Sequence, residues 1–147
     1  MGILSEISGT RVYLDTSPFI FYVEGVAPYA GELHPLMDAI DTGTLEGITG
    51  EITIAECLVK PIKDGNTPLI TAFNLALQNK THFRVHPVTR SHWIEAAQIR
   101  SKSTLKLPDA VHLALAEHFG CTTFVTNDTD FRGATSMKVV VLAELIP

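Results

Sequence analysis

Short apolar stretches of strand-like composition alternate with longer stretches of helical periodicity along most of the chain. The strand-like stretches are rich in β-branched and aromatic residues, and glycine or proline separates them from the helical ones. This alternation predicts βαβ units, which build a parallel sheet with helices on both faces. Five strands are expected, at residues 11–15, 45–49, 82–88, 122–126 and 138–141.

The helical stretches are recognised by apolar residues that recur every three or four positions. Proline suits the first turn of a helix and disrupts later turns, so prolines mark expected boundaries. Pro18 is expected at the first position of one helix, after Thr16 or Ser17 as its cap, and Pro61 is expected to end the helix that starts at Glu51. The expected helices cover residues 18–24, 31–42, 51–59, 67–79, 91–101 and 108–118.

The length of 147 residues suits one domain with its own hydrophobic core, and we expect a single domain over residues 1–147. Hydrophobic residues make up 46% of the chain and charged residues 18%, which excludes a disordered protein. No apolar run is long enough for a membrane span, and the N-terminal residues do not resemble a signal peptide. A cytoplasmic location without membrane contact is therefore expected. Cys57 and Cys121 lack metal-binding spacing and are expected to be reduced and buried.

Two aspartates stand where predicted strands end. Asp15 closes the first strand, and Asp128 follows the strand TTFVT. Ligands of open parallel sheets bind beyond the carboxyl ends of the strands, so both carboxylates are expected to face such a crevice. Each also suits an ordinary turn, because aspartate and asparagine are common turn residues. Asp130 is either a further acid of the same site or a loop residue.

Two more acids lie on predicted helices. Asp109 falls in the first turn of a helix that is apolar on nearly all sides, where the helix dipole favours a carboxylate. Glu56 shares helical spacing with Ile52 and Val59, so we expect it within an apolar stripe that faces inward. An inward carboxylate costs free energy unless it is paired or binds a metal. The alternative is a capping box, in which Thr53 and Glu56 satisfy the start of the helix.

Four neighbouring carboxylates would repel one another without a cation. Mg²⁺ and Mn²⁺ prefer oxygen ligands, and such ions can activate water and stabilise charge during phosphodiester hydrolysis. The net charge of −5 is unusual for a protein that binds nucleic acid, and an acidic metal site accounts for part of it. Of the six histidines only His112 lies one turn from an expected site acid. Basic residues cluster at Arg90, Arg100, Lys102 and Lys106, which suits either contact with a nucleic-acid backbone or, as charge alone favours, a solvent-exposed helix face.

The order of these acids and their surroundings resembles the PIN-domain family, and especially its VapC-type toxins. The segments that carry the resemblance are VYLDTSPFIFY, TIAECLVKP, LKLPDAVHLALA and TNDTDF. The resemblance implies a three-layer α/β/α PIN-like domain with a central parallel sheet of about five strands. It also implies an endoribonuclease that uses Mg²⁺ or Mn²⁺. The acids implied in catalysis and metal binding are Asp15, Glu56, Asp109 and Asp128, with Thr126 and Asp130 beside them.

The resemblance further implies three partners: an RNA substrate, an antitoxin whose C-terminal segment fills the site, and a second copy in a homodimer. Asn127 departs from the family pattern, which often has a basic side chain at this position. A phosphatase of the haloacid-dehalogenase type is disfavoured, because that chemistry needs Asp-x-Asp and the chain has Asp15-Thr16-Ser17. A PIN-like module that binds RNA or protein without cleavage stays open as an alternative.

Overall fold

A parallel sheet of five strands runs through the centre of the protein. The computed structural model describes residues 2–147. The strands are arranged in the order β3-β2-β1-β4-β5, and every neighbouring pair is parallel. The sequence therefore predicted both the number of strands and their direction correctly. The strands are β1 (Arg11–Leu14), β2 (Glu46–Gly50), β3 (Phe83–His86), β4 (Thr123–Thr126) and β5 (Lys138–Val141).

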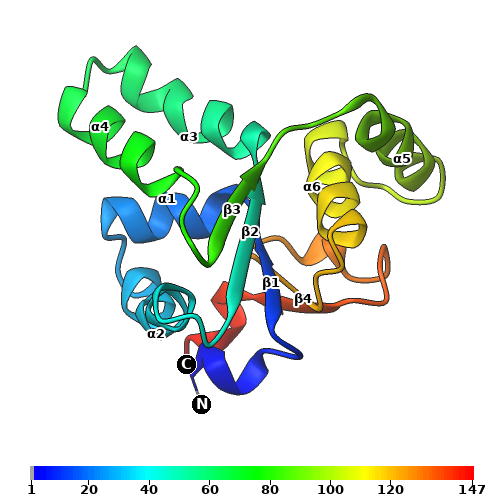
Figure 1. Ribbon diagram of the computed structural model, residues 1–147, viewed down its shortest axis with the longest axis horizontal. Helices are drawn as coiled ribbons and strands as arrows, with labels where there is room; N and C mark the ends of the chain where they lie inside the picture. The colour runs from blue at the N-terminus through cyan, green and yellow to red at the C-terminus, as the bar shows by residue number, and fades with distance from the viewer. Residues whose placement is uncertain (1) are drawn as a thin grey trace.

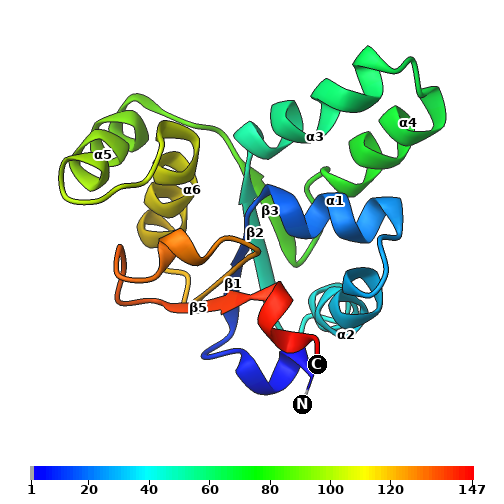
Figure 2. The ribbon, with the colours of Figure 1, turned by 180° about the vertical axis from the view of Figure 1, so that it is seen from behind.

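Helices cover both faces of the sheet and complete the expected three-layer α/β/α arrangement (Figure 1). Figure 2, from behind, shows helices α1 to α4 on one side of the sheet and α5 with α6 on the other. Within the described residues, no helix has the length and apolar character that a membrane crossing requires. The helices are α1 (Thr16–Glu24), α2 (Tyr29–Asp41), α3 (Glu51–Lys63), α4 (Thr67–Ala76), α5 (Arg90–Ser101) and α6 (Leu107–His118), with short 3₁₀ turns η1 (Ile3–Glu6), η2 (Thr129–Phe131) and η3 (Leu142–Leu145).

Successive side chains of the central strands enter two different hydrophobic cores. Val12 and Leu14 of β1 pack on the side of α1 and α2, whereas Tyr13 packs on the side of α6. The Tyr13 ring stacks on Phe124 of β4, with 5.2 Å between the ring centroids. Because alternate residues of a strand face opposite ways, a strand buried on both faces must be apolar throughout. This explains the continuous apolar runs seen in the sequence.

The ends of β1 and β4 lie at the topological switch point of the sheet, where the direction of the strand connections reverses. From β1 the chain passes outward to β2 and β3, and it then returns to lay β4 on the other side of β1. Leu14 pairs with Val125, so the two strands end at nearly the same level. At such a switch the connections leave in opposite directions and open a crevice beyond the carboxyl edge. Asp15 and Asp128 follow these two strand ends.

Proline misled the sequence analysis at two helix boundaries. Helix α3 continues through Pro61 to Lys63, although a proline at this position leaves the carbonyl of Cys57 without its usual helical donor. Helix α1 begins at Thr16 with Asp15 as its N-cap, and not at Pro18 as expected. The whole first turn tolerates proline, since its N–H groups have no partner within the helix. Pro35 even lies well inside α2, so a proline does not by itself mark a helix end in this chain.

The two cysteines are free and buried, as expected from their spacing. Burial raises the pKa of Cys57 to about 12, with further repulsion from nearby glutamates. Burial likewise raises the pKa of Cys121 to about 12. A thiol must lose its proton to act as a nucleophile or metal ligand, so neither residue suits such a role near neutral pH.

Candidate active site

A polar cleft of about 380 Å³ opens beyond the carboxyl ends of β1 and β4. The four acids singled out in the sequence all line this cleft, although they come from four different parts of the chain. Asp130 is not among the lining residues. The cleft is lined by Asp15, Thr16, Ser17, Ile20, Glu56, Asp109, His112, Thr126, Asn127 and Asp128.

Asp15 is the most deeply buried of these acids, with only 7% of its surface exposed. Its carboxylate accepts a hydrogen bond of 2.5 Å from the Thr126 hydroxyl and a longer one of 3.3 Å from Ser17. The Thr126 hydroxyl also accepts from the backbone N–H of Asp128, at 3.1 Å. One threonine side chain thus joins the acid after β1 to the turn after β4.

The surroundings of Asp15 disfavour its negative charge. Burial raises the pKa of this carboxyl to about 6, although His112 and the hydroxyls of Thr126 and Ser17 act in the opposite direction. Repulsion from Asp109 raises it further. Burial is the main cause, because it penalises the charged form. A bound cation would offset that penalty by favouring the ionised carboxylate.

Glu56 reaches the cleft from α3 and is held by two donors on the same oxygen. The Thr16 hydroxyl donates to Oε1 at 2.6 Å, and Nε2 of His112 lies 2.7 Å from the same atom. Burial alone would raise the pKa of Glu56, but these hydrogen bonds and the attraction of His112 outweigh it and lower the pKa. Glu56 is therefore ionised more readily than Asp15.

The expected apolar stripe around Glu56 is wrong. Val59 is 66% exposed, and the buried face of α3 instead follows Thr53 and Cys57. Glu56 flanks that face and lines the cleft at the edge of the sheet. The capping-box alternative is also wrong, because Thr53 lies inside the helix and its hydroxyl pairs with that of Thr49 at 2.7 Å. Helical spacing alone did not reveal which side of α3 meets the core.

Asp109 and Asp128 complete the acidic lining. Asp109 lies in the first turn of α6, as predicted, and is partly buried. Burial, followed by repulsion from Asp128, raises its pKa. Asp128 caps η2 by accepting the N–H of Asp130 at 2.9 Å. Of the two candidates for a fourth acid, Asp128 borders the cleft, whereas Asp130 is exposed and lies outside its lining.

Sequence reasoning missed three side chains that support the acids. Thr16 and Ser17 were interpreted as helix caps, yet they bond Glu56 and Asp15; their position directly after a strand-end aspartate was a usable signal. Tyr13 is fully buried, and its hydroxyl lies 2.7 Å from Nδ1 of His112. No local pattern indicates this contact, because the two residues are far apart in the sequence.

The composition of the cleft fits a hard divalent cation. Among the described lining residues there is no lysine or arginine to balance the four carboxylates. Nowhere in residues 2–147 do three His, Cys, Asp or Glu side chains meet closely enough to hold an ion by themselves. Mg²⁺ usually keeps several of its water molecules, so spaced carboxylates around an open cleft suit it better than they suit a fully dehydrated ion.

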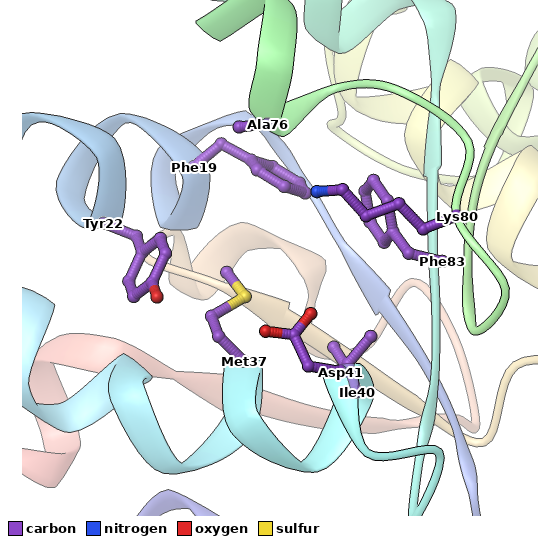
Figure 3. Close-up of a pocket in the computed structure, with 8 residues that line it drawn as sticks. All are labelled: Phe19, Tyr22, Met37, Ile40, Asp41, Ala76, Lys80 and Phe83. Atoms are coloured by element: carbon purple, nitrogen blue, oxygen red, sulfur yellow. The ribbon is translucent and has the colours of Figure 1, made fainter. Parts of the chain in front are cut away.

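A second pocket, of about 200 Å³, lies between α1, α2, α4 and the segment before β3 (Figure 3). Aromatic and aliphatic side chains form most of its wall, including Phe19, Met37 and Phe83. Asp41 is the one acid among the lining residues that the structure describes, and Lys80 is the one base. This pocket therefore lacks the paired acids that hydrolytic chemistry needs, and the polar cleft is the better candidate.

Comparison with known proteins identifies the fold. The model of the PIN domain family matches residues 12–135. A toxin–antitoxin complex from Klebsiella pneumoniae superposes with a TM-score of 0.67 at 22% identity, over 89% of this chain and 97% of that one. VapC20 from Mycobacterium tuberculosis, a sarcin–ricin loop cleaving toxin, gives 0.69 at 18% identity over 87% and 98%.

VapBC2 from Rickettsia felis, bound to a DNA fragment from its promoter, also gives a TM-score of 0.69, at 12% identity over 90% of this chain and 98% of that one. A search among curated protein sequences finds no match. These structural neighbours share the fold, and the family match runs from β1 to beyond β4. That match covers most of the chain and includes every acid of the cleft, so the chain belongs to the PIN domain family.

Proposed function

We propose that the protein is a Mg²⁺- or Mn²⁺-dependent endoribonuclease, built as one PIN-like domain over residues 1–147. The observation that carries this proposal is the cleft with four carboxylates and no lysine or arginine among its described lining residues. Membership of the PIN family supports it, and so does the likeness to a sarcin–ricin loop cleaving toxin. The residues proposed for catalysis and metal binding are Asp15, Glu56, Asp109 and Asp128.

In the proposed reaction the carboxylates of the cleft hold the cation, and Thr126 positions two of them. A bound Mg²⁺ or Mn²⁺ would polarise the phosphate and increase the acidity of water. The pKa values of Asp15 and Asp109 are raised without a cation, so its binding would stabilise the ionised forms of these two carboxylates most. Thr126 holds Asp15 and the turn of Asp128 in register, so that the acids need little rearrangement before an RNA phosphate enters.

The proposed partners are RNA, an antitoxin and a second copy of the chain. Exposed basic side chains on α5 and on the loop before α6 are proposed to contact the RNA backbone, which would make binding weaker at high salt. The antitoxin proposal is supported by structural neighbours that are toxin–antitoxin complexes. The homodimer rests on the family resemblance, and a cytoplasmic location stays a prediction from the sequence.

Cleavage of labelled single-stranded RNA tests the proposal. We expect the purified protein to cut RNA internally with Mg²⁺ or Mn²⁺ and to lose that activity in EDTA, since carboxylates alone cannot neutralise the developing charge. Adding excess Mn²⁺ back to the EDTA sample should restore cleavage. Cleavage that persists in EDTA would contradict the metal requirement. RNA binding without any cleavage would favour the non-catalytic PIN-like module instead.

The two acids after β4 provide a matched pair of variants. Asp128→Asn is expected to slow cleavage by about a hundredfold, because it removes one charge from the cleft while keeping a side chain that can cap η2. Asp130→Asn should stay within about threefold of the wild type, because Asp130 lies outside the lining. Initial rates under identical Mn²⁺ concentrations measure both. The reverse order of effects would assign the fourth acid to Asp130.

A further inference from the structure

The two carboxylate oxygens of Glu56 have unequal surroundings. Oε1 accepts from the Thr16 hydroxyl at 2.6 Å and faces Nε2 of His112 at 2.7 Å. Among the described residues, no hydrogen bond reaches Oε2. Both donors therefore act on one oxygen, and they leave the other available in the cleft that Glu56 lines.

Both ring nitrogens of His112 are held by hydrogen-bond partners. The ionised carboxylate of Glu56 can only accept, so Nε2 must donate to it. Nδ1 of a neutral ring is then an acceptor, and the Tyr13 hydroxyl lies 2.7 Å away to donate. A buried hydrogen bond on one ring nitrogen sets the tautomer at the other. Tyr13 thus supports the bond that His112 makes to Glu56.

The His112 ring is also held in place by packing. It is 2% exposed and lies on α6, in a turn whose neighbours are all buried. The ring meets Tyr13 edge to face at a centroid distance of 5.7 Å, and Tyr13 itself stacks on Phe124. A donor fixed in this way can orient an acidic side chain that is otherwise 34% exposed and free to rotate.

We propose that His112 is a positioning residue: with Thr16 it clamps Oε1 of Glu56 and so presents Oε2 to a divalent cation. The inference rests on the proposed metal-dependent function, which it deepens by naming what orients one of the acids. Groups that hold a metal-binding carboxylate in this way commonly affect metal affinity by about 10- to 100-fold. His112 itself does not contact the cation or the substrate in this arrangement.

Two amide substitutions at His112 separate positioning from simple packing. The longer amide side chain in His112→Gln can place an N–H near the position of Nε2, whereas the side chain in His112→Asn is one methylene too short to reach Glu56. We expect His112→Asn to weaken Mn²⁺ binding about tenfold and His112→Gln to stay within about threefold of wild type, measured by calorimetry on metal-free protein. His92→Asn is the control, since His92 is also buried but lies outside the cleft. It should leave Mn²⁺ affinity unchanged.

A third variant covers the case in which neither His112 substitution folds. Tyr13→Phe keeps the stacked ring but removes the donor to Nδ1, and it should weaken Mn²⁺ binding about threefold. Nitrogen NMR of the wild type should show His112 protonated at Nε2. Wild-type Mn²⁺ affinity in folded His112→Asn, or in Tyr13→Phe when His112→Asn is unfolded, would overturn the proposal.

Separate measurements distinguish this inference from the proposed function. A wild type that binds Mn²⁺ but cuts no RNA, with weaker binding in His112→Asn, would refute the ribonuclease and leave the clamp standing. Metal-dependent RNA cleavage by the wild type, together with unchanged Mn²⁺ affinity in His112→Asn, would refute the clamp alone. Equal losses in the glutamine and asparagine variants would also overturn it, because packing and not donation would then explain the effect.

Discussion

Replacing Asp15 with asparagine is expected to lower the rate of RNA cleavage by about a thousandfold or more. Asp15 lies at the switch point of the sheet, is 7% exposed and shares the cleft with three other acids. Asparagine has nearly the same shape and can still bond the hydroxyls of Thr126 and Ser17, which rotate to donate or accept. It cannot supply the charge that binds a divalent cation, so function should be lost without loss of the fold.

Single-turnover cleavage of labelled RNA at saturating Mn²⁺ measures this effect. Asp38→Asn is a matched control, because it makes the same chemical change on α2, outside the cleft. Asp38→Asn should cut RNA at the wild-type rate. Loss of activity in both variants would point to a general charge effect. Full activity in Asp15→Asn would remove Asp15 from the site and seriously weaken the metal-dependent mechanism.

The same substitution is expected to stabilise the metal-free protein at neutral pH. Burial raises the pKa of Asp15 to about 6, from 3.8 in the unfolded chain, so the folded state binds more protons between these two values. Where the folded state binds more protons, the free energy of unfolding decreases as the pH rises. As the pH rises from about 4 to about 6, ionisation of Asp15 therefore lowers the free energy of unfolding. Above that range the charged carboxylate destabilises the fold.

The rise of the Asp15 pKa from 3.8 to about 6 corresponds to a destabilisation on the order of 3 kcal/mol at neutral pH. The melting temperature of Asp15→Asn should accordingly exceed that of the wild type by several degrees at about pH 7.5, and the difference should vanish near pH 4. Comparing the two proteins cancels the contributions of groups that do not interact with Asp15. His86 and His92, whose pKa values are lowered mainly by burial, titrate in both proteins and cancel in the difference.

Melting curves in EDTA and in saturating Mn²⁺ provide a second test of this prediction. A ligand that binds only the folded state stabilises it, so Mn²⁺ should raise the melting temperature of the wild type more than that of Asp15→Asn. The amount by which the melting temperature of Asp15→Asn exceeds that of the wild type in EDTA should then become smaller or change sign. A stability gain that grows toward acid pH would contradict the assigned pKa shift. Identical responses of both proteins to Mn²⁺ would contradict a role for Asp15 in metal binding.

Much of the fold could be predicted because its signals are local. Strands buried on both faces carry mainly apolar and β-branched side chains, and residues 12–14 and Thr123–Thr126 are buried at every position. The alternation of such strands with helices restricts the sheet to a parallel one. Boundaries set by Pro18 and Pro61 were wrong, because helices of this chain include proline, as α2 also does at Pro35.

The candidate site was predictable in part for a related reason. Parallel strands bring their carboxyl ends to one edge, so aspartates directly after two strands were expected to share that edge. Glu56 was expected to face inward, but the supporting stripe was wrong, since Val59 is exposed and Thr53 is buried. The choice between Asp128 and Asp130 also needed the structure, because both follow β4 and only the path of the turn separates them.

The sequence alone determined the kinds of elements, the parallel sheet with helices on both faces and the acids that stand at strand and helix ends. These features depend on interactions between residues a few positions apart, which a local pattern records. Only the tertiary structure decided that β4 returns beside β1, that Thr126 bonds Asp15, and that Tyr13, His112 and Glu56 form a connected series. These contacts join residues 111, 99 and 56 positions apart, and their partners are chosen by strand order and packing, which no short segment specifies.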